Sequence, residues 1–176
     1  GTSTCMLWRH SATGIDGIVP IPFPRWGPAP VLPQREYLAG LVHMITTFDH
    51  AIFFISRAEA TLMDPSQRLL LEKGYQALYD SSLRRLHLRG QDFGVFLGVD
   101  KFEYPEVLPV LLTGDTPYRT TATGLSMSAG RVSYSLGLQG PCMGVDCACA
   151  SALVATDIAV HDVKRSECSS ALALGA

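Results

Sequence analysis

Residues 140–164 read GPCMGVDCACASALVATDIAVHDVK, and the hydrophobic pattern changes within this stretch. A Gly-Pro turn opens it. The apolar run that follows, residues 142–148, is too short for a helix and indicates a buried strand. From Ser151 onward, apolar residues recur at helical spacing, at Val154 and Ile158 among others. The pattern therefore places Cys149 at the turn between a strand and a helix.

This position predicts a reactive thiol at Cys149. The first backbone N–H groups of a helix lack partners and carry partial positive charge, which favours a thiolate over a thiol. The residues around the sulfur are small and leave room for a substrate: Ala148, Ala150, Ser151 and Ala152. We interpret Cys149 as a candidate nucleophile. The alternative is a small buried hydrophobe, which is how we interpret Cys147, on the strand side of the turn.

Composition and charge exclude several classes of function. The chain has 176 residues, of which 47% are hydrophobic and 17% charged, as in a packed globular domain. A net charge of -2 does not favour nucleic acid or an anionic membrane as a partner. The apolar runs fall short of the roughly 20 residues that span a bilayer, and no signal peptide is visible. We expect a cytoplasmic protein.

The cysteines do not suggest a disulfide framework or a metal site. There are five, an odd number, with no C-x-x-C pair. Cys147 and Cys149 form a C-x-C, but no further ligand lies at a suitable spacing. The histidines are scattered, and His161 lies about three turns into the helix after Cys149, some 15 Å along its axis and too far to be its base. We expect no bound metal and no directly bound cofactor.

The N-terminal third of the chain is the least regular. Residues 1–35 contain six prolines between positions 20 and 33, and we predict an ordered surface arm without a regular element. Three aromatic residues are expected to anchor it on a core: Trp8, Phe23 and Trp26. A disordered Pro-rich tail is the alternative. Residues 36–62 are mixed, with a segment expected to pack on the body through Phe48, Ile52, Phe53 and Ile55.

The remaining segments alternate between helix and strand. Asp64 is a good N-cap for a helix over 65–79, and Thr123 and Gly137 are the expected N-cap and stop of a second helix over 124–136. Residues 92–99 read DFGVFLGV, typical of a strand buried on both faces, whose glycines imply close approach by a helix or a substrate. Residues 168–176 begin another strand, and 80–91 are expected to form a loop. This alternation predicts an α/β layered fold.

Several segments together resemble β-ketoacyl synthases. VDCACASALVATDIAV (145–160) is similar to their active-site pattern V-D-T-A-C-S-S-S-L-V-A, which aligns Cys149 with the family nucleophile. Four further segments match in the family's order. They read IPFPRW (21–26), FDHAIFFISRAEATLMDPSQRLLLE (48–72), AGRVSYSLGLQGP (129–141) and KRSECSSALALGA (164–176). The segment at 21–26 resembles the I-P-x-x-R-W of modular type I polyketide synthases. Several positions differ from the residues that are usual in the family. Cys147 stands in place of a Thr, and Ala150 and Ala152 stand in place of two Ser. Phe54 stands in place of a Gly, and Leu125 in place of a common Asn.

The resemblance implies a thiolase-like fold of αβαβα layers, of which residues 1–176 would be the N-terminal half, truncated at both ends. The family's H-G-T-G-T and N-x-G-H motifs, which carry two catalytic histidines, do not occur in this sequence. The piece alone is therefore expected to be inactive. Homodimerisation of the full-length parent is also implied.

The implied chemistry is a decarboxylative Claisen condensation. Cys149 would accept an acyl chain from the phosphopantetheine arm of an acyl carrier protein, with its own backbone N–H in the oxyanion hole. A malonyl group on the carrier would lose CO2, and the carbanion would attack the Cys149 thioester. Two alternatives stay open. One is a catalytically inactive ketosynthase-like scaffold or dimerisation module, which would not need Cys149. The other is a thiolase-like or chain-initiating condensing enzyme.

Overall fold

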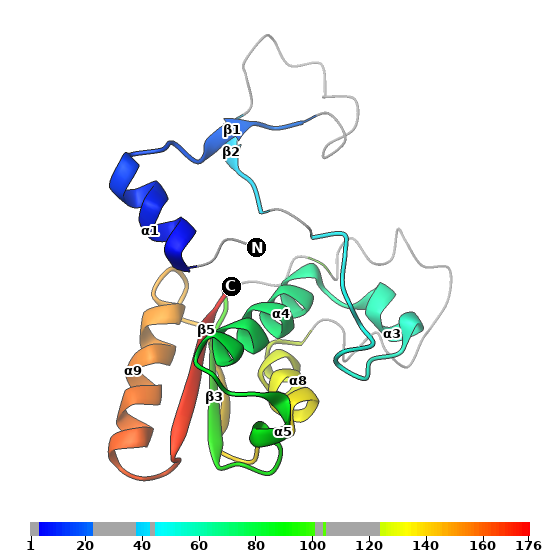
Figure 1. Ribbon diagram of the computed structural model, residues 1–176, viewed down its shortest axis with the longest axis vertical. Helices are drawn as coiled ribbons and strands as arrows, with labels where there is room; N and C mark the ends of the chain where they lie inside the picture. Colours follow the sequence, from blue (N-terminus) through cyan, green and yellow to red (C-terminus); the bar gives the residue numbers. More distant parts are fainter. Residues whose placement is uncertain (1–3, 23–37, 43–44, 101–103, 105–123) are drawn as a thin grey trace. The chain divides into compact units, whose positions relative to one another are not determined.

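The computed structural model describes residues 4–22, 38–42, 45–100, 104 and 124–176 (Figure 1). The chain divides into two compact units, residues 1–44 and residues 45–176. Each unit is described by itself below. Within the described ranges, no helix is long and apolar enough to cross a membrane.

The first unit contains a helix and a small hairpin. Helix α1 spans Thr4–Thr13, and β1 (Ile18–Pro20) pairs antiparallel with β2 (Leu38–Gly40). The prediction of an arm without regular elements is wrong here. Helix α1 ends before the first proline, and β1 contains only Pro20, as the last residue of an edge strand, where proline is tolerated. Trp8 is 77% exposed, so it does not pack within the first unit, and its anchoring on the core stays a prediction. Phe23 and Trp26 lie outside the described residues.

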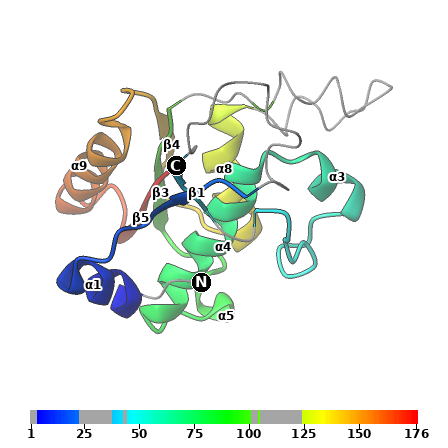
Figure 2. The same cartoon turned by 90° about the horizontal axis from the view of Figure 1, so that it is seen from above.

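The second unit is built on a three-stranded parallel sheet. Its strand order is β4 (Cys142–Val145), β3 (Phe93–Gly98), β5 (Ser170–Gly175). Helix α8 (Leu125–Leu136) connects β3 to β4, and α9 (Ser151–Lys164) connects β4 to β5. Helix α9 covers one face of the sheet, while α8 and α4 (Pro65–Asp80) cover the other (Figures 1 and 2). The predicted α/β layering is confirmed.

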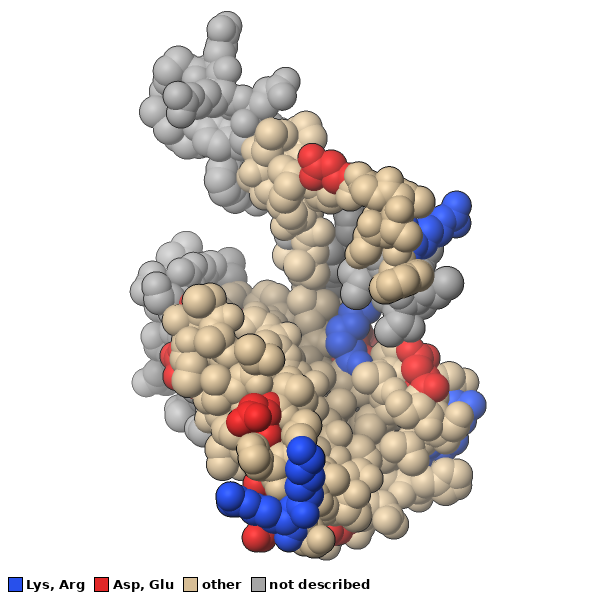
Figure 3. Space-filling model, turned by 90° about the vertical axis from the view of Figure 1, so that its left-hand side faces the viewer, with Lys and Arg blue, Asp and Glu red and all other residues tan. Residues whose placement is uncertain are grey.

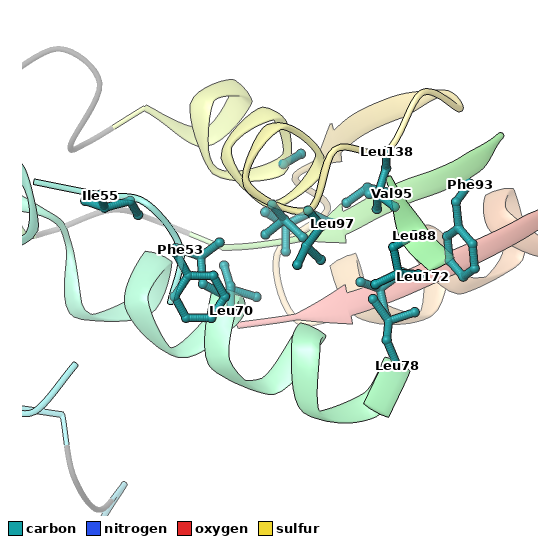
Figure 4. Packing of buried hydrophobic residues seen from close by; sticks show 14 of the residues in the cluster. Phe53, Ile55, Leu70, Leu78, Leu88, Phe93, Val95, Leu97, Leu138 and Leu172 are labelled. Atoms are coloured by element: carbon teal, nitrogen blue, oxygen red, sulfur yellow. The ribbon is translucent and has the colours of Figure 1, made fainter. Parts of the chain in front are cut away.

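The central strand β3 separates two apolar layers. All six of its residues are buried, as the continuous apolar run predicts. Val95 and Leu97 belong to the larger core beneath α4 and α8 (Figure 4), whereas Phe96 packs with Ala155 and Ala159 of α9. Helices thus cover β3 on both faces, whereas β4 at the edge of the sheet is partly exposed. The carboxyl ends of the strands are left to position the loops that follow them.

Helix α4 begins where the sequence predicts. The Asp64 side chain accepts a hydrogen bond from the Ser66 N–H at 2.7 Å, and Pro65 occupies the first helical position. Its buried face includes Leu70, Leu71 and Leu78, as the spacing predicts. The cap and the apolar stripe together fix this helix against the sheet.

Two short helices were not predicted. Helix α3 spans Arg57–Leu62, and α5 spans Arg85–Leu88, inside the segment expected to be a loop. Elements this short hold too few residues to show a helical period. Tertiary contacts hold both, since Leu88 is 1% exposed and Glu59 of α3 pairs with Arg131 of α8. Helix α3 also has a local cap, because the Ser56 hydroxyl accepts a hydrogen bond from the Glu59 N–H at 3.1 Å. In the preceding segment Phe53 and Ile55 are buried as expected, but Ile52 is 45% exposed.

Helix α8 confirms its predicted end and corrects its predicted start. Gly137 closes it in the left-handed conformation, with φ +71°. Its N-cap is Gly124 rather than the predicted Thr123, which lies outside the described residues.

Phe54 has a backbone conformation that bulky residues seldom adopt. Its φ is +57°, in the left-handed region, and the resemblance above places a glycine at this position. The ring is 85% exposed, and the Arg85 guanidinium lies 4.6 Å from its centre. Arg85 is itself fixed, because it donates to the carbonyls of Ile52 and Ser135. The stacked arginine offsets part of the cost of the left-handed backbone.

Candidate active site

Cys149 lies in the short turn that joins β4 to α9. Strand β4 ends at Val145 and α9 begins at Ser151, so the thiol stands two residues before the helix. The residue is exposed. The predicted position of Cys149 between a strand and a helix start is confirmed. The prediction that this strand is buried is wrong, because Cys142 and Met143 of β4 are exposed and Gly144 and Val145 are only partly buried.

The turn before Cys149 is tight and partly strained. Ala148 has a φ of +51°, a left-handed conformation that costs a residue with a Cβ roughly 1–2 kcal/mol. Hydrogen bonds hold it there. The Ala150 N–H donates to the Cys147 carbonyl at 3.2 Å, and the Ala148 N–H donates to Asp146 Oδ1 at 3.1 Å. Backbone strain of this kind gathers at functional sites.

Ser151 connects the helix to this turn. Its hydroxyl accepts a hydrogen bond from the Cys147 N–H at 2.7 Å and donates one to the Ala148 carbonyl at 2.7 Å. Ser151 is 3% exposed, and both bonds are partly buried. The two residues before Cys149 are therefore fixed to the first turn of α9. The sequence identifies Ser151 only as a small neighbour, although Ser hydroxyls commonly bond to backbone groups three or four residues away.

Two glycines allow the first turn of α9 to lie directly on the sheet. Gly98 of β3 and Gly175 of β5 are partners in the parallel register. A Cβ at Gly98 would lie 2.3 Å from the backbone C and O of Ser151, and one at Gly175 would lie 2.6 Å from the Ala152 Cβ. The helix approach predicted at Gly98 is confirmed. The site thus lies at the carboxyl ends of parallel strands, where open α/β sheets bind their ligands.

Within the described part of the chain, the backbone N–H of Cys149 differs from those of its neighbours in the turn. Among the hydrogen bonds of the described residues, the N–H groups of Cys147, Ala148, Ala150 and Ser151 all donate within the turn. None of the bonds in that set uses the N–H of Cys149. An N–H beside an exposed thiol can donate to an oxygen on a group bonded to that sulfur.

The other thiols differ from Cys149 in their surroundings. Burial raises the pKa of Cys168, which is 2% exposed, and desolvation also raises the pKa of Cys142. Desolvation therefore disfavours the thiolate form at both of these sulfurs. Cys147 is exposed and lies in the turn beyond the end of β4. Its interpretation as a buried structural thiol is wrong, because the strand stops two residues before it.

Other candidate ligands do not gather near the site. His161 lies on α9 in an exposed pair with Asp157, with 3.7 Å between Nε2 and Oδ1. Within the part of the chain that the structure describes, no three His, Cys, Asp or Glu side chains could hold a metal together. On the face shown in Figure 3, acidic and basic side chains are dispersed among uncharged ones.

The comparisons with known proteins identify the family. The family model of the β-ketoacyl synthase N-terminal domain matches residues 1–176, and the chain belongs to this family. It is 39% identical over 178 residues to the pikromycin polyketide synthase component PikAII of Streptomyces venezuelae, covering 96% of this chain and 5% of the relative. It is 40% identical over 173 residues to the erythronolide synthase EryA3 of Saccharopolyspora erythraea, covering 96% and 5%.

Solved structures agree with this assignment. The ketosynthase from module 6 of the bacillaene synthase of Bacillus subtilis matches with a TM-score of 0.76 and 29% identity, over 93% of this chain and 27% of that chain. An oxazolomycin ketosynthase domain from Streptomyces albus matches with a TM-score of 0.75 and 26% identity, over 93% and 30%. The predicted thiolase-like fold and the resemblance to modular polyketide synthases are confirmed. The chain spans under a third of these solved structures.

Proposed function

We propose that Cys149 is the acyl-accepting nucleophile of a β-ketoacyl synthase that performs a decarboxylative Claisen condensation in polyketide or fatty-acid biosynthesis. The observation that carries this proposal is the exposed thiol at the start of α9, in a turn held by Ser151. Membership of a family of condensing transferases supports it. An inactive scaffold would have no need of an exposed thiol in this position.

In the first half-reaction, the Cys149 sulfur attacks the thioester carbonyl of an acyl group on the phosphopantetheine arm of an acyl carrier protein. Negative charge develops on the acyl oxygen, and the Cys149 N–H donates a hydrogen bond to it. The phosphopantetheine thiolate then leaves, and the acyl chain remains on Cys149 as a thioester. The small side chains of Ala150 and Ala152 leave space for that chain.

In the second half-reaction, a malonyl thioester on the carrier protein loses CO2 and gives a carbanion. The carbanion attacks the carbonyl carbon bonded to Cys149, a carbon–carbon bond forms, and the Cys149 thiolate leaves. This step needs groups that stabilise the carbanion. In the family these are two histidines in motifs that the present sequence lacks, so we place the reaction in a longer polypeptide. Residues 1–176 alone should form no condensation product from malonyl carrier protein.

Exposed apolar groups support the proposal that residues 1–176 are one part of a larger domain. On α9, Leu153 is 75% exposed, Val160 45% and Val163 38%. A cluster of this kind usually marks a surface that another element or partner covers. We propose that the rest of a thiolase-like domain covers α9, and that the complete domain is a cytoplasmic homodimer.

Labelling of the full-length parent with cerulenin, a ketosynthase-directed electrophile, tests the proposal. Peptide mapping by mass spectrometry is expected to find the adduct on Cys149 and to lose it in Cys149→Ala. Cys142→Ser is the matched control, and it should keep both the adduct and the condensation of malonyl carrier protein. A parent that condenses acyl chains without modification of Cys149 would refute the assignment. A parent that condenses nothing, with Cys149 unlabelled, would favour the scaffold.

A further inference from the structure

Two exposed thiols lie in the same turn, separated by a single residue. Cys147 and Cys149 are both free and exposed, and Ala148 between them is in the left-handed conformation. The proposed condensation uses only Cys149. It leaves Cys147 without a role, although its thiol stands beside the nucleophile.

The backbone brings these two residues within reach of a disulfide. Because consecutive Cα atoms are about 3.8 Å apart, residues separated by one position lie at most roughly 7 Å apart. A disulfide needs a Cα separation of about 4.4–6.8 Å. The hydrogen bond from the Ala150 N–H to the Cys147 carbonyl bends this segment into a turn, which shortens the separation further. A rotation of the two side chains would then bring the sulfurs together.

The other two thiols of the second unit, Cys142 and Cys168, are poor competitors for either sulfur. Cys168 is 2% exposed beneath α9, and a Cβ at Gly94 would meet its sulfur at 3.1 Å. Cys142 begins β4, five residues before Cys147 and at the opposite end of the strand from the turn. Within the second unit, reaction of Cys149 with another thiol therefore points to Cys147.

We propose that Cys147 and Cys149 form a dithiol modification site that takes a hydroperoxide. The Cys149 sulfur attacks the peroxide, gains one oxygen to become a sulfenic acid, and releases an alcohol or water. The Cys147 thiol then attacks that sulfur, a sulfur–sulfur bond forms, and the oxygen leaves as water. In total the dithiol loses two electrons and two protons, and the peroxide is reduced.

The disulfide removes the nucleophile from acyl transfer in a reversible form. While it exists, Cys149 cannot accept an acyl chain. It also cannot proceed to the sulfinic and sulfonic acids, which are largely irreversible. An exposed disulfide belongs to the labile class that other thiols reduce readily. Cys147 thus serves as a resolving thiol that protects Cys149 during oxidative stress.

The test is peroxide treatment of the full-length protein, followed by alkylation of the free thiols, digestion and mass spectrometry. In the wild type, the peptide with Cys147 and Cys149 is expected to lose two hydrogen masses and to regain them with dithiothreitol. We expect reductant to recover more than about half of the Cys149 in the wild type and less than about a tenth in Cys147→Ser, where Cys149 proceeds to the sulfinic acid. Cys142→Ser, the matched control, should behave as the wild type.

A second variant, Cys147→Thr, guards against a folding defect in Cys147→Ser and should give the same loss of recovery. The inference is overturned if the wild type accumulates the sulfinic acid at Cys149, or if either Cys147 variant recovers as fully as the wild type. Because the readout is a mass at two thiols, it can fail while the condensation assay succeeds, and the reverse also holds.

Discussion

Replacement of Gly98 by Ala adds one methyl group where β3 meets the first turn of α9. The new Cβ would lie 2.3 Å from the C and O of Ser151 and 2.5 Å from the Ala152 N–H nitrogen. Ordinary contacts begin at about 3.4 Å, so α9 must move away by about 1 Å (3.4 − 2.3). These are backbone atoms of a packed helix and cannot rotate away as a side chain can.

The cost follows from this displacement. Overpacking typically lowers the free energy of unfolding by about 1–3 kcal/mol. Because the Cβ would meet helix backbone, which cannot rotate away, we expect a loss of about 3 kcal/mol for Gly98→Ala. With a urea m-value of about 2 kcal/mol/M, the unfolding midpoint should fall by about 1.5 M. Acyl transfer to Cys149 should fall by about 100-fold, since a misplacement of about 1 Å is enough for that loss.

The assay is urea unfolding followed by far-UV circular dichroism, together with the rate of thioester labelling at Cys149. The matched control is Gly130→Ala in α8, where a Cβ meets nothing within 4 Å. Alanine is the better helix former, so this control should gain about 0.5–1 kcal/mol and keep its labelling rate. If Gly98→Ala changes stability by less than about 0.5 kcal/mol and labels Cys149 normally, the argument for close packing at the site is wrong.

Three further predictions follow from single side chains. Ser151→Ala removes both hydrogen bonds of the hydroxyl, so it should lower the free energy of unfolding by about 1–3 kcal/mol and slow acylation of Cys149. Ser151→Thr keeps a hydroxyl and should restore part of the acylation rate. Thermal unfolding and labelling of Cys149 measure the two effects. Phe54→Gly should change the free energy of unfolding by less than about 0.5 kcal/mol or raise it, because glycine adopts positive φ without strain. Phe54→Val should lower it by more than about 1 kcal/mol, because a β-branched residue is the least compatible with positive φ. Equal effects of the two variants in urea melts would contradict this. Because burial raises the folded pKa of Cys168, the unfolded chain releases the thiol proton first, and stability should decline above about pH 8.5 by up to roughly 1.4 kcal/mol per pH unit. Cys168→Ala should flatten this decline in melts between pH 7 and 10.

The elements that the sequence predicts well are those with local signals. The apolar run of β3, the cap of α4 at Asp64 and the change of period before Ser151 each depend on a few adjacent residues, and each is confirmed. Helix α5 was missed because a four-residue turn shows no period and depends on the burial of Leu88.

The site shows the same division between local and tertiary signals. The position of Cys149 follows from the spacing of its neighbours. The left-handed Ala148 and the two bonds of Ser151 do not, because a Cβ-bearing residue at positive φ is stabilised only by the surrounding structure. Exposure of Cys147 was also missed, since an apolar run does not reveal where the strand within it ends.

Direct observation of the acylated residue is the measurement on which this interpretation depends. The full-length protein would be incubated with an acyl thioester of N-acetylcysteamine, a short analogue of the phosphopantetheine arm, then digested and mapped by mass spectrometry. We predict that the acyl group is found on Cys149 and that Cys142 and Cys147 remain unmodified. An acyl group on Cys147 or Cys142, with Cys149 unmodified, would contradict the proposal that the start of α9 carries the nucleophile.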